Sequence, residues 1–553
     1  MKLNGAQILI NVLLEQGVDR IFGYPGGAVL PIYDALYACR NRIAHYMTAH
    51  EQGAAHAADG YARLTGKTGV VLATSGPGAT NLVTGLAAAY MDSVPMVAIT
   101  GNVGTTLIGR DSFQEVYIAG ITMSVTKHNF IVRHTEDLAD TVRKAFRIAQ
   151  SGRRGPVLVD IPKDVALQKA EYAPAPAVGP DPAPAPDPQR IARAAELLNG
   201  AERPVIYFGG GVGASEAGGK LRALLEKADI PAAYTLMGAG VLSYDDPHSL
   251  GLLGMHGGRA ANLAVDHADV VLAIGTRFSD RVALNTEKFA HRSKLIHIDI
   301  DPSEINKNVQ VAHSVVGDVH DVLSRLLPMI EPKSHRTWMQ RIAAWQKEDY
   351  VPQDDGNTLH PFGVIRTLCD TAGPDAVFVT DVGQHQMWAA QYLRHTRPRS
   401  FLTSGGLGAM GYGYGAAIGA ALAADGRPVV HITGDGSFHM NLNEACTAVT
   451  YGVPVITVIL NNRALGMVHQ WQKAFYGARY SSSEPDRKTD YVKVAEGFGA
   501  MGMRCETIPE LRAAMQTALQ QRGPVWIECP ISREERVLPM IPAGGTVDDI
   551  IME

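Results

Sequence analysis

Two polar side chains near the end of the chain have types and a spacing that could hold a metal ion and a diphosphate. Asp435 lies between Gly434 and Gly436, and Asn462 follows the next apolar run. Flanking glycines let the backbone turn sharply and approach a phosphate, while carboxylate and amide oxygens are hard ligands suited to Mg²⁺. An isolated Asp-Gly pair is more often an ordinary turn. The surrounding elements must therefore decide between the two interpretations.

The elements around these residues favour the metal site. Residues 428–433 are apolar and β-branched, 441–452 have the pattern of a helix that ends at a glycine, and 453–460 form a second apolar run. A strand, a helix and a strand of these lengths make one right-handed βαβ unit. Asp435 and Asn462 then lie just beyond the carboxyl ends of neighbouring parallel strands, where such sheets bind ligands.

A second candidate, Glu51, begins a helix predicted over residues 50–63, which is rich in alanine and glycine. A carboxylate at this position is favoured by the helix dipole alone, so by itself it indicates no more than a helix terminus. The small residues permit close packing against another surface. A catalytic interpretation of Glu51 needs a partner motif elsewhere in the chain.

Size and composition indicate a multidomain protein whose chemistry involves small molecules. With 553 residues the chain should form roughly three or four domains. The net charge of -5 and the lack of Lys/Arg clusters argue against nucleic acid as a partner. The first 17 residues read as an amphipathic helix and no apolar run has membrane-spanning length. Five scattered cysteines fit buried thiols in a reducing compartment, so we expect a cytoplasmic protein.

The chain repeats one architectural unit. Val70-Val71 aligns with Val429-Val430, and in both segments an apolar strand leads to a glycine-rich turn, a helix, a Val-Pro pair and another strand. A third copy is expected from residue 204. The predicted fold class is therefore α/β, with three doubly wound parallel-sheet domains and a C-terminal tail.

Domain boundaries follow from proline content. The segment 173–188 alternates proline with alanine and aspartate and predicts a semi-rigid extended linker. A weaker boundary lies between residues 332 and 359. We therefore predict an N-terminal domain over 1–172, a central domain over 189–335, a C-terminal domain over 358–530, and a tail or lid over 531–553.

With both motifs present in this order, the chain resembles thiamine diphosphate enzymes. Along almost its whole length it is similar to the large, catalytic subunits of biosynthetic acetohydroxyacid synthases, also called acetolactate synthases. The segments that carry this resemblance are 22–27 (FGYPGG), 74–81 (TSGPGATN), 113–115 (FQE), 126–128 (TKH), 254–257 (GMHG), 381–388 (DVGQHQMW) and 466–471 (GMVHQW).

The resemblance implies that the enzyme decarboxylates pyruvate and transfers the hydroxyethyl unit to a second pyruvate or to 2-oxobutyrate. The products are 2-acetolactate and 2-aceto-2-hydroxybutyrate, in the first common step of valine, leucine and isoleucine biosynthesis. Glu51 would promote the imino tautomer of the aminopyrimidine, which removes the C2 proton of the cofactor. Asp435, Asn462 and the main-chain carbonyl of Ala464 would hold Mg²⁺ against the diphosphate.

Further site residues are carried over from the same motifs. Met410 would hold the cofactor in its bent conformation, and Gln114 and Lys127 would line the entrance of the active site. Thiamine diphosphate is expected to contact a set of loop residues at the ends of strands: Pro25, Gly26, Gly76, Asn81, Gln384, His385, Gly408, Gly434, Gly436, Ser437, Gly466 and Met467.

The acceptor acid carries a carboxylate, for which a guanidinium is a natural bidentate partner. By resemblance that residue is Arg281, although an isolated loop arginine is more often a surface residue. Trp471 lies where the family has the aromatic residue that selects the larger acceptor, which predicts a preference for 2-oxobutyrate. Phe113, Met255 and Met467 complete the expected pocket, and each of these apolar residues could equally be core.

The central domain carries a Gly-x-Gly-x-x-Ala pattern after a strand, which alone is a weak nucleotide-binding signal. In the resembled enzymes this domain binds FAD, which the reaction does not need for any net redox step. The residues expected around it are Gly209, Gly210, Gly211, Gly254, His256, Gly275, Arg277, Asp299 and Asp318. Ser279 stands where the family commonly has aspartate, and Gly415 where it commonly has proline.

The resemblance also predicts partners. The family places its active site between two subunits, so a homodimer or tetramer is expected, together with a small regulatory subunit. Two related activities stay open: a pyruvate oxidase that uses the same cofactors, and a catabolic acetolactate synthase without FAD. A catalytically inactive binding or scaffolding paralogue is a third alternative, disfavoured by the presence of both Glu51 and the metal residues.

Overall fold

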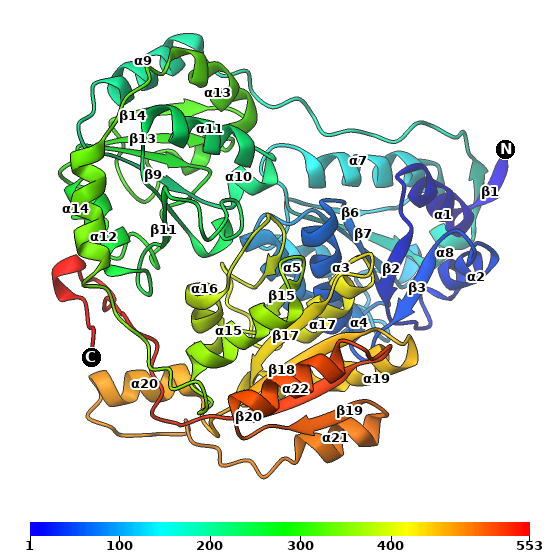
Figure 1. Ribbon diagram of the computed structural model, residues 1–553. Helices are drawn as coiled ribbons and strands as arrows, with labels where there is room; N and C mark the ends of the chain where they lie inside the picture. Colours follow the sequence, from blue (N-terminus) through cyan, green and yellow to red (C-terminus); the bar gives the residue numbers. More distant parts are fainter.

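The computed structural model describes residues 1–553, which form three six-stranded parallel sheets, each covered by helices (Figure 1). This arrangement confirms the fold class predicted from the sequence. The N-terminal sheet contains β2 (Arg20–Gly23), β3 (Ala44–Met47), β4 (Gly69–Ala73), β5 (Met96–Asn102), β6 (His128–Ile131) and β7 (Pro156–Pro162). Its helices are α1 (Gly5–Glu15), α2 (Leu30–Ala38), α3 (Glu51–Thr65), α4 (Pro77–Asn81), α5 (Val83–Met91), α6 (Ile118–Thr122), α7 (Leu138–Gln150) and α8 (Lys163–Leu167).

The C-terminal sheet is built on the same plan. Its strands are β15 (Val377–Thr380), β16 (Phe401–Leu402), β17 (Val429–Gly434), β18 (Val455–Asn461), β19 (Met501–Arg504) and β20 (Val525–Pro530). Its helices are α15 (Pro361–Ala372), α16 (Gln384–Tyr392), α17 (Tyr412–Ala421), α18 (Asp435–Phe438), α19 (Ala445–Thr450), α20 (Gly466–Phe475), α21 (Tyr491–Phe498) and α22 (Ile508–Ala518).

The repeat seen in the sequence reappears as a repeated strand order. The N-terminal order is β3-β2-β4-β5-β7-β6 and the C-terminal order is β16-β15-β17-β18-β20-β19, so corresponding strands occupy corresponding places. In both sheets the second strand along the chain lies on one side of the first, and the third strand lies on its other side. The topological switch points therefore lie between β2 and β4 and between β15 and β17, where open sheets of this kind bind ligands.

The central sheet belongs to the same class but is not a third copy of that topology. Its order is β11-β10-β9-β12-β13-β14, so its switch point lies between β9 and β12. The strands are β9 (Pro204–Phe208), β10 (Ala232–Tyr234), β11 (Ser249–Leu252), β12 (Val270–Ile274), β13 (Lys294–Asp299) and β14 (His313–Val316). The helices are α9 (Pro188–Asn199), α10 (Gly210–Ala214), α11 (Gly218–Ala228), α12 (Arg259–His267), α13 (Val319–Leu326) and α14 (Arg336–Gln346).

Helices α3 and α17 join the N-terminal and C-terminal units through one shared core. Phe22 and Tyr61 of one unit and Tyr412 and Trp526 of the other belong to a single cluster of 42 buried residues. The helices approach closely because small residues face each other. A Cβ on Gly60 would collide with the carbonyl of Ala416, and one on Gly419 with that of Ala57.

Gly415 has a packing reason of the same kind. A Cβ at this position would lie 2.8 Å from the carbonyl oxygen of Gly53, so a proline ring has no room against α3. Helix α3 begins at Glu51, and His50 caps it because its ring accepts a hydrogen bond from the backbone N–H of Gln52. The helix is terminated by Gly66, which has the left-handed conformation. The predicted helix over 50–63 is confirmed.

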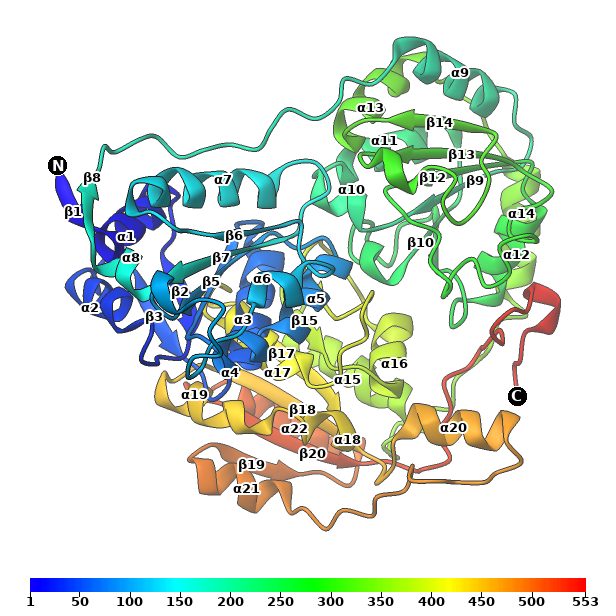
Figure 2. The same ribbon diagram turned by 180° about the vertical axis from the view of Figure 1, so that it is seen from behind.

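The connections between the units are extended. Residues 173–187 form neither helix nor strand, and both views show this segment crossing from the short strand β8 (Lys169–Glu171) to α9 (Figures 1 and 2). After β20 the chain runs past α20 to the central unit, with only a 3₁₀ turn at Val547–Asp549 (Figure 1). No helix is both long and apolar enough to cross a membrane.

Three local expectations differ from the structure. The N-terminal helix starts at Gly5, after the short strand β1 (Lys2–Asn4), because Asn4 caps it. The turn expected after β9 is helical and forms α10. The helix expected over 441–452 begins with a 3₁₀ turn at Leu442–Glu444 and continues as α19.

Candidate active site

The switch point of the N-terminal sheet is lined by glycines that let its loops approach one another closely. A Cβ on Gly26 would lie 2.5 Å from Thr74, which follows β4, so the loops after β2 and β4 are in contact. Gly76 has φ +60°, and a Cβ there would meet the backbone of Gln114. The hydroxyl of Thr74 is buried and has no hydrogen-bond partner. The structure thus brings Gly26, Gly76 and the main chain of Gln114 together at one cradle.

Glu51 lies at the edge of this cradle and is buried. Asn81 donates a hydrogen bond of 2.9 Å to its Oε2 atom. A Cβ on Gly78 would lie 3.1 Å from Glu51 Oε1, so a side chain at this position would crowd that oxygen. The carboxylate of Glu444, from the C-terminal unit, accepts from the backbone N–H groups of Ala49 and His50 at 3.1 Å each and so fixes the start of α3.

The second switch point holds the residues expected for the metal. Asp435 is 2 % exposed, and its Oδ1 atom has no hydrogen-bond partner. Burial raises the pKa of its carboxyl to about 6, against the lowering effect of the backbone N–H of Asn462. A Cβ on Gly434 would lie 2.9 Å from the ring of His385, so the loops after β15 and β17 are neighbours.

The side chain of Asn462 completes this corner. Its Oδ1 accepts from the backbone N–H of Ala464 at 3.1 Å, and its Nδ2 donates to Gln384 at 3.2 Å. The carbonyl oxygen of Ala464 lies 3.9 Å from a Cβ position on Gly436. The possible ligands are the unpartnered carboxylate oxygen of Asp435, the amide oxygen of Asn462 and the main-chain carbonyl of Ala464. Mg²⁺ prefers hard oxygen ligands of this kind. These residues therefore fit the ion.

The loop before α17 carries Met410 and is anchored from the N-terminal unit. Asp92 accepts hydrogen bonds from the backbone N–H groups of Gly405 and Gly406 at 3.0 and 2.7 Å. Gly408 and Gly411 both have positive φ, 69° and 82°, so the backbone turns around the half-buried Met410. Ser437 accepts from the N–H of Gly411, which ties this loop to α18.

The residues expected for the acceptor acid lie partly together. Arg281 contacts the sulfur of Met255, 3.5 Å from its Nη1 atom, and its guanidinium is otherwise paired only with the exposed Asp280. Trp471 and Met467 share helix α20, and the indole N–H of Trp471 is buried without a partner. Phe113 is 88 % exposed, so within one chain it lines no pocket.

The central switch point has a glycine cradle of its own. Gly209 and Gly211 donate backbone hydrogen bonds to the carbonyls of Ile274 and Gly275, and a Cβ on Gly211 would lie 2.6 Å from Gly275 Cα. Asp299 ends the next strand, β13. A dinucleotide crosses a sheet of this order at this point.

Two other residues expected to lie around FAD, Asp318 and His256, have surroundings that differ from those of the glycine cradle. Asp318 caps α13, where it accepts from the N–H groups of His320 and Asp321. Burial lowers the pKa of His256 to about 4, so its ring is neutral.

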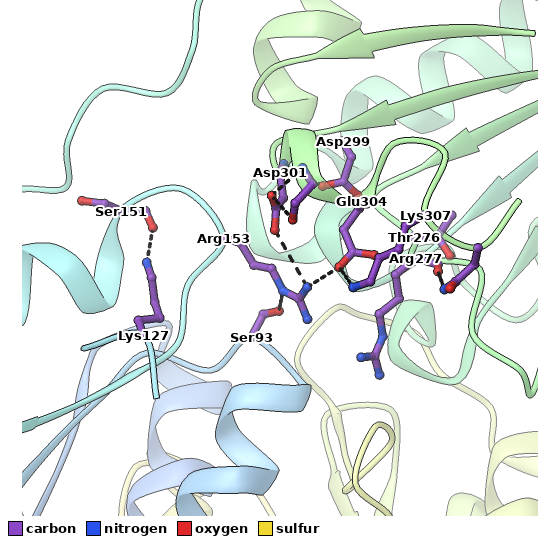
Figure 3. Close-up of polar contacts among 12 residues, drawn as sticks. Ser93, Lys127, Ser151, Arg153, Thr276, Arg277, Asp299, Asp301, Glu304 and Lys307 are labelled. Carbon is purple, nitrogen blue, oxygen red and sulfur yellow. Dashed lines mark hydrogen bonds and ion pairs between the residues drawn. The ribbon is translucent and has the colours of Figure 1, made fainter. Parts of the chain in front are cut away.

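Figure 3 shows where this site meets the N-terminal unit. Arg153 donates to Ser93 at 2.9 Å and to Glu304 at 2.7 Å, and it approaches Asp301. The other carboxylate oxygen of Glu304 is buried without a partner, and Arg277 extends toward the glycine loop at Gly406. No local sequence pattern marks Arg153, because its partners lie far along the chain. It belongs among the candidates for holding a nucleotide.

Lys127 lies on the N-terminal side of this junction (Figure 3). Its ammonium donates to the carbonyls of Ile148 and Ser151, and burial lowers its pKa to about 8 (Figure 3). The structure thus places its ammonium at the end of α7, and no hydrogen bond joins it to Glu51 or Gln114.

Comparisons with known proteins agree with this geometry. Three models of thiamine pyrophosphate enzymes match: the N-terminal TPP binding domain over residues 3–121, the central domain over 191–326, and the C-terminal TPP binding domain over 381–529. The acetolactate synthase of Mycobacterium bovis is 46 % identical over 99 % of this chain and 91 % of its own length.

Two further relatives are similar over nearly their full lengths. The probable acetolactate synthase large subunit of Methanocaldococcus jannaschii is 46 % identical, with 99 % of this chain and 95 % of the relative covered. The acetolactate synthase isozyme 2 large subunit of Escherichia coli is 44 % identical, with 99 % of both covered. The chain belongs to the acetolactate synthase family of thiamine pyrophosphate enzymes. The N-terminal and C-terminal units are the two that match its TPP binding domains.

Proposed function

We propose that this protein is an acetolactate synthase that joins decarboxylated pyruvate to a second pyruvate or to 2-oxobutyrate. The single observation that carries the proposal is the unpartnered, buried Oδ1 of Asp435 beside Asn462 and Ala464. This site is paired in the same chain with a buried glutamate at the matching switch point. When bound, thiamine diphosphate supplies a nucleophilic carbon and accepts the negative charge left by loss of CO₂.

Glu51 is proposed to hold a proton at a ring nitrogen of the cofactor. Asn81 occupies Oε2, which leaves Oε1 as the acceptor that faces the cradle of Gly26, Gly76 and Gly78. Asp435, Asn462 and Ala464 would hold Mg²⁺. Gln384, His385, Gly434, Gly436, Ser437 and Gly466 are proposed to surround the diphosphate. Met410 would hold the cofactor in its bent conformation, and Met467 lies on the neighbouring helix α20.

Arg281 is proposed to bind the carboxylate of the acceptor acid. Its guanidinium is 57 % exposed and has no buried carboxylate partner, so it is available for a substrate carboxylate. Met255 and Trp471 would supply the apolar wall that distinguishes 2-oxobutyrate from pyruvate. An apolar wall rewards one additional methylene by roughly 1–3 kcal/mol.

FAD is proposed to bind across the central switch point. Gly209, Gly211 and Gly275 provide the close backbone approach, and the free carboxylate oxygen of Glu304 together with Asp299 offers acceptors for an adenosine moiety. Arg153 and Arg277 place two cations near the expected phosphates. On this basis residues 1–172, 189–335 and 358–530 are proposed as pyrimidine-, FAD- and diphosphate-binding domains, with linker 173–188 and tail 531–553.

A dimer with shared active sites is proposed because a surface beside Gly76 is apolar and uncovered. Phe113, Tyr117 and Met123 are 88, 64 and 68 % exposed, and large contiguous apolar surfaces usually mark interfaces. A second copy would bring Phe113 into the acceptor pocket. Two of the relatives compared above are named large subunits, which supports a small regulatory subunit as a further partner.

The test is product identification by NMR with pyruvate, 2-oxobutyrate, thiamine diphosphate, Mg²⁺ and FAD. Dominant 2-aceto-2-hydroxybutyrate without oxygen uptake supports the proposal. Acetate or acetyl phosphate formed together with flavin reduction would instead show a pyruvate oxidase. Unchanged activity after removal of FAD would favour the catabolic form. No pyruvate consumption, even with a candidate regulatory subunit added, would favour the scaffolding paralogue.

A further inference from the structure

The tail segment 535–541, which we call the strap, is fastened by glutamine side chains. Gln470 of α20 pairs with the backbone of Val537 in both directions: its Oε1 accepts from the N–H at 2.9 Å, and its Nε2 donates to the carbonyl at 3.1 Å. Gln391 of α16 donates to the carbonyls of Leu538 and His256 at 3.1 and 2.9 Å. The strap therefore joins the C-terminal unit to the central one.

One of these fastenings continues to the metal site. Gln384 donates from Nε2 to Gln470 Oε1 at 2.9 Å and also to the carbonyl of Glu535 at 2.9 Å. Its own Oε1 accepts from Nδ2 of Asn462 at 3.2 Å. A continuous series of hydrogen bonds thus runs from Val537 through Gln470 and Gln384 to Asn462. Gln391 has no place in it.

The series and the backbone N–H of Ala464, which donates to Asn462 Oδ1, together determine which way the Asn462 amide faces. An asparagine side chain can bind Mg²⁺ only through its oxygen, and rotation by 180° would present the NH₂ group instead. Gln384 holds the NH₂ group on its own side, and Gln470 in turn holds the Gln384 amide so that its oxygen faces Asn462. Both glutamines are buried, at 3 and 5 % exposure, so no water replaces a lost partner easily.

Gly466 permits the close approach of the Gln384 and Asn462 amides. A Cβ there would collide with Gln384 Oε1 and lie 2.7 Å from Asn462 Nδ2, so a larger residue would force the two amides apart. Gly466 is also the first residue of α20, which carries Met467 and Trp471. The helix that supplies the expected acceptor pocket is therefore the helix that orients the metal ligand.

We propose that Gln470 is a positioning residue that connects the strap to Asn462 through Gln384 and so sets the affinity of the metal–diphosphate site. The inference rests on the proposed binding of thiamine diphosphate and Mg²⁺. Partners that orient metal ligands typically account for about 10- to 100-fold in metal affinity. Because binding couplings are reciprocal, Mg²⁺ should also stabilise the hydrogen bonds that hold the strap.

The first measurement is calorimetric titration of MgCl₂ into the full chain saturated with thiamine diphosphate. We expect Gln470→Ala to weaken Mg²⁺ binding about 10- to 100-fold, and Gln391→Ala, which loosens the same strap without touching the series, to change it less than about threefold. Equal weakening by both variants would show a general effect of strap packing and would overturn the proposal, as would unchanged binding in Gln470→Ala. Circular dichroism of each metal-free variant controls for folding.

A double-mutant cycle isolates the orientation effect. In an Asn462→Asp background the metal ligand has two equivalent oxygens, so its orientation no longer matters. Gln470→Ala should then lose most of its effect on the Mg²⁺ dissociation constant. An effect of the same size in both backgrounds contradicts the proposal. Failure of the wild-type protein to bind Mg²⁺ and thiamine diphosphate overturns the proposed function as well, whereas wild-type binding with an unresponsive Gln470→Ala variant overturns this inference alone.

Discussion

The carboxylate of Glu444 lies 3.1 Å from the backbone nitrogen of His50, so a residue of the C-terminal unit anchors the two residues that precede the helix beginning at Glu51. It also accepts from Ala49 and from the hydroxyl of Thr447. Gly53 leaves room for this contact, because a Cβ there would collide with Glu444 Oε1. The position of the proposed proton-holding carboxylate therefore depends on a side chain of the other unit.

Replacing Glu444 by glutamine should lower kcat clearly while reducing the free energy of unfolding only slightly. The amide keeps the shape but replaces charge-assisted hydrogen bonds to the backbone of Ala49 and His50 by weaker ones, which costs about 1 kcal/mol in unfolding free energy. Glu51 then loses its fixed position, and we expect kcat to fall about tenfold or more. Denaturant unfolding and steady-state kinetics measure the two effects. Glu510→Gln, at the exposed start of α22, is the matched control and should leave kcat unchanged.

The pH dependence of Mg²⁺ binding follows from Asp435. Burial raises the pKa of its carboxyl from 3.8 to about 6, so in the metal-free protein it holds a proton below about pH 6. Mg²⁺ must displace that proton, and we expect the dissociation constant to rise about tenfold for each pH unit below 6. Titration calorimetry between pH 5 and 8 checks this. A flat profile across that range would contradict it.

The raised pKa of the Asp435 carboxyl also predicts how the unfolding free energy of the metal-free protein depends on pH. The carboxyl pKa is higher in the folded than in the unfolded chain, so metal-free stability falls as pH rises from about 4 to 6 and is then level. Asp435→Asn removes the buried charge and should stabilise the metal-free protein at pH 8 by on the order of 2 kcal/mol, with no gain below pH 4. The variant should bind Mg²⁺ far more weakly. Thermal unfolding without metal at the two pH values measures the difference.

The sequence predicted what local patterns encode. Asp435 and Asn462 follow two apolar strands of one βαβ unit, so the spacing was sufficient to predict that they lie at the carboxyl ends of neighbouring strands. The repeat between residues 70 and 429 likewise indicated two sheets that proved to share a strand order.

What the sequence did not predict depends on long-range packing. Glu444 with His50, Gln470 with Val537 and Arg153 with Glu304 are each separated by many residues, and no periodicity marks such a pair. The central sheet looked like a third copy because a strand, a turn and a helix are local. Its strand order depends instead on which faces pack together, and it differs.

Flavin binding should depend on Gly275. Its φ is +56°, and a Cβ there would lie 2.7 Å from Gly211 Cα. Gly275→Ala forces apart the loops after β9 and β12 and adds roughly 1 kcal/mol or more of backbone strain. We expect the purified variant to lose its flavin absorbance while retaining Mg²⁺-dependent thiamine diphosphate binding. Gly219→Ala, in open space on the same domain, should keep the flavin, and retention by Gly275→Ala would refute this placement of the site.

Acceptor choice should depend on Trp471. The indole is half-buried on α20, packs edge to face on Phe475 at 6.0 Å, and has an N–H without a partner, as expected of a wall that a substrate completes. Trp471→Leu removes apolar contact with the ethyl group of 2-oxobutyrate but leaves the carboxylate contact of Arg281. We expect the ratio of 2-aceto-2-hydroxybutyrate to 2-acetolactate in competition to fall about tenfold, with pyruvate consumption little changed. NMR of the product mixture measures the ratio, and Val468→Ala on the exposed face of the same helix is the control. A Trp471→Leu ratio equal to that of the control would assign the indole to core packing instead.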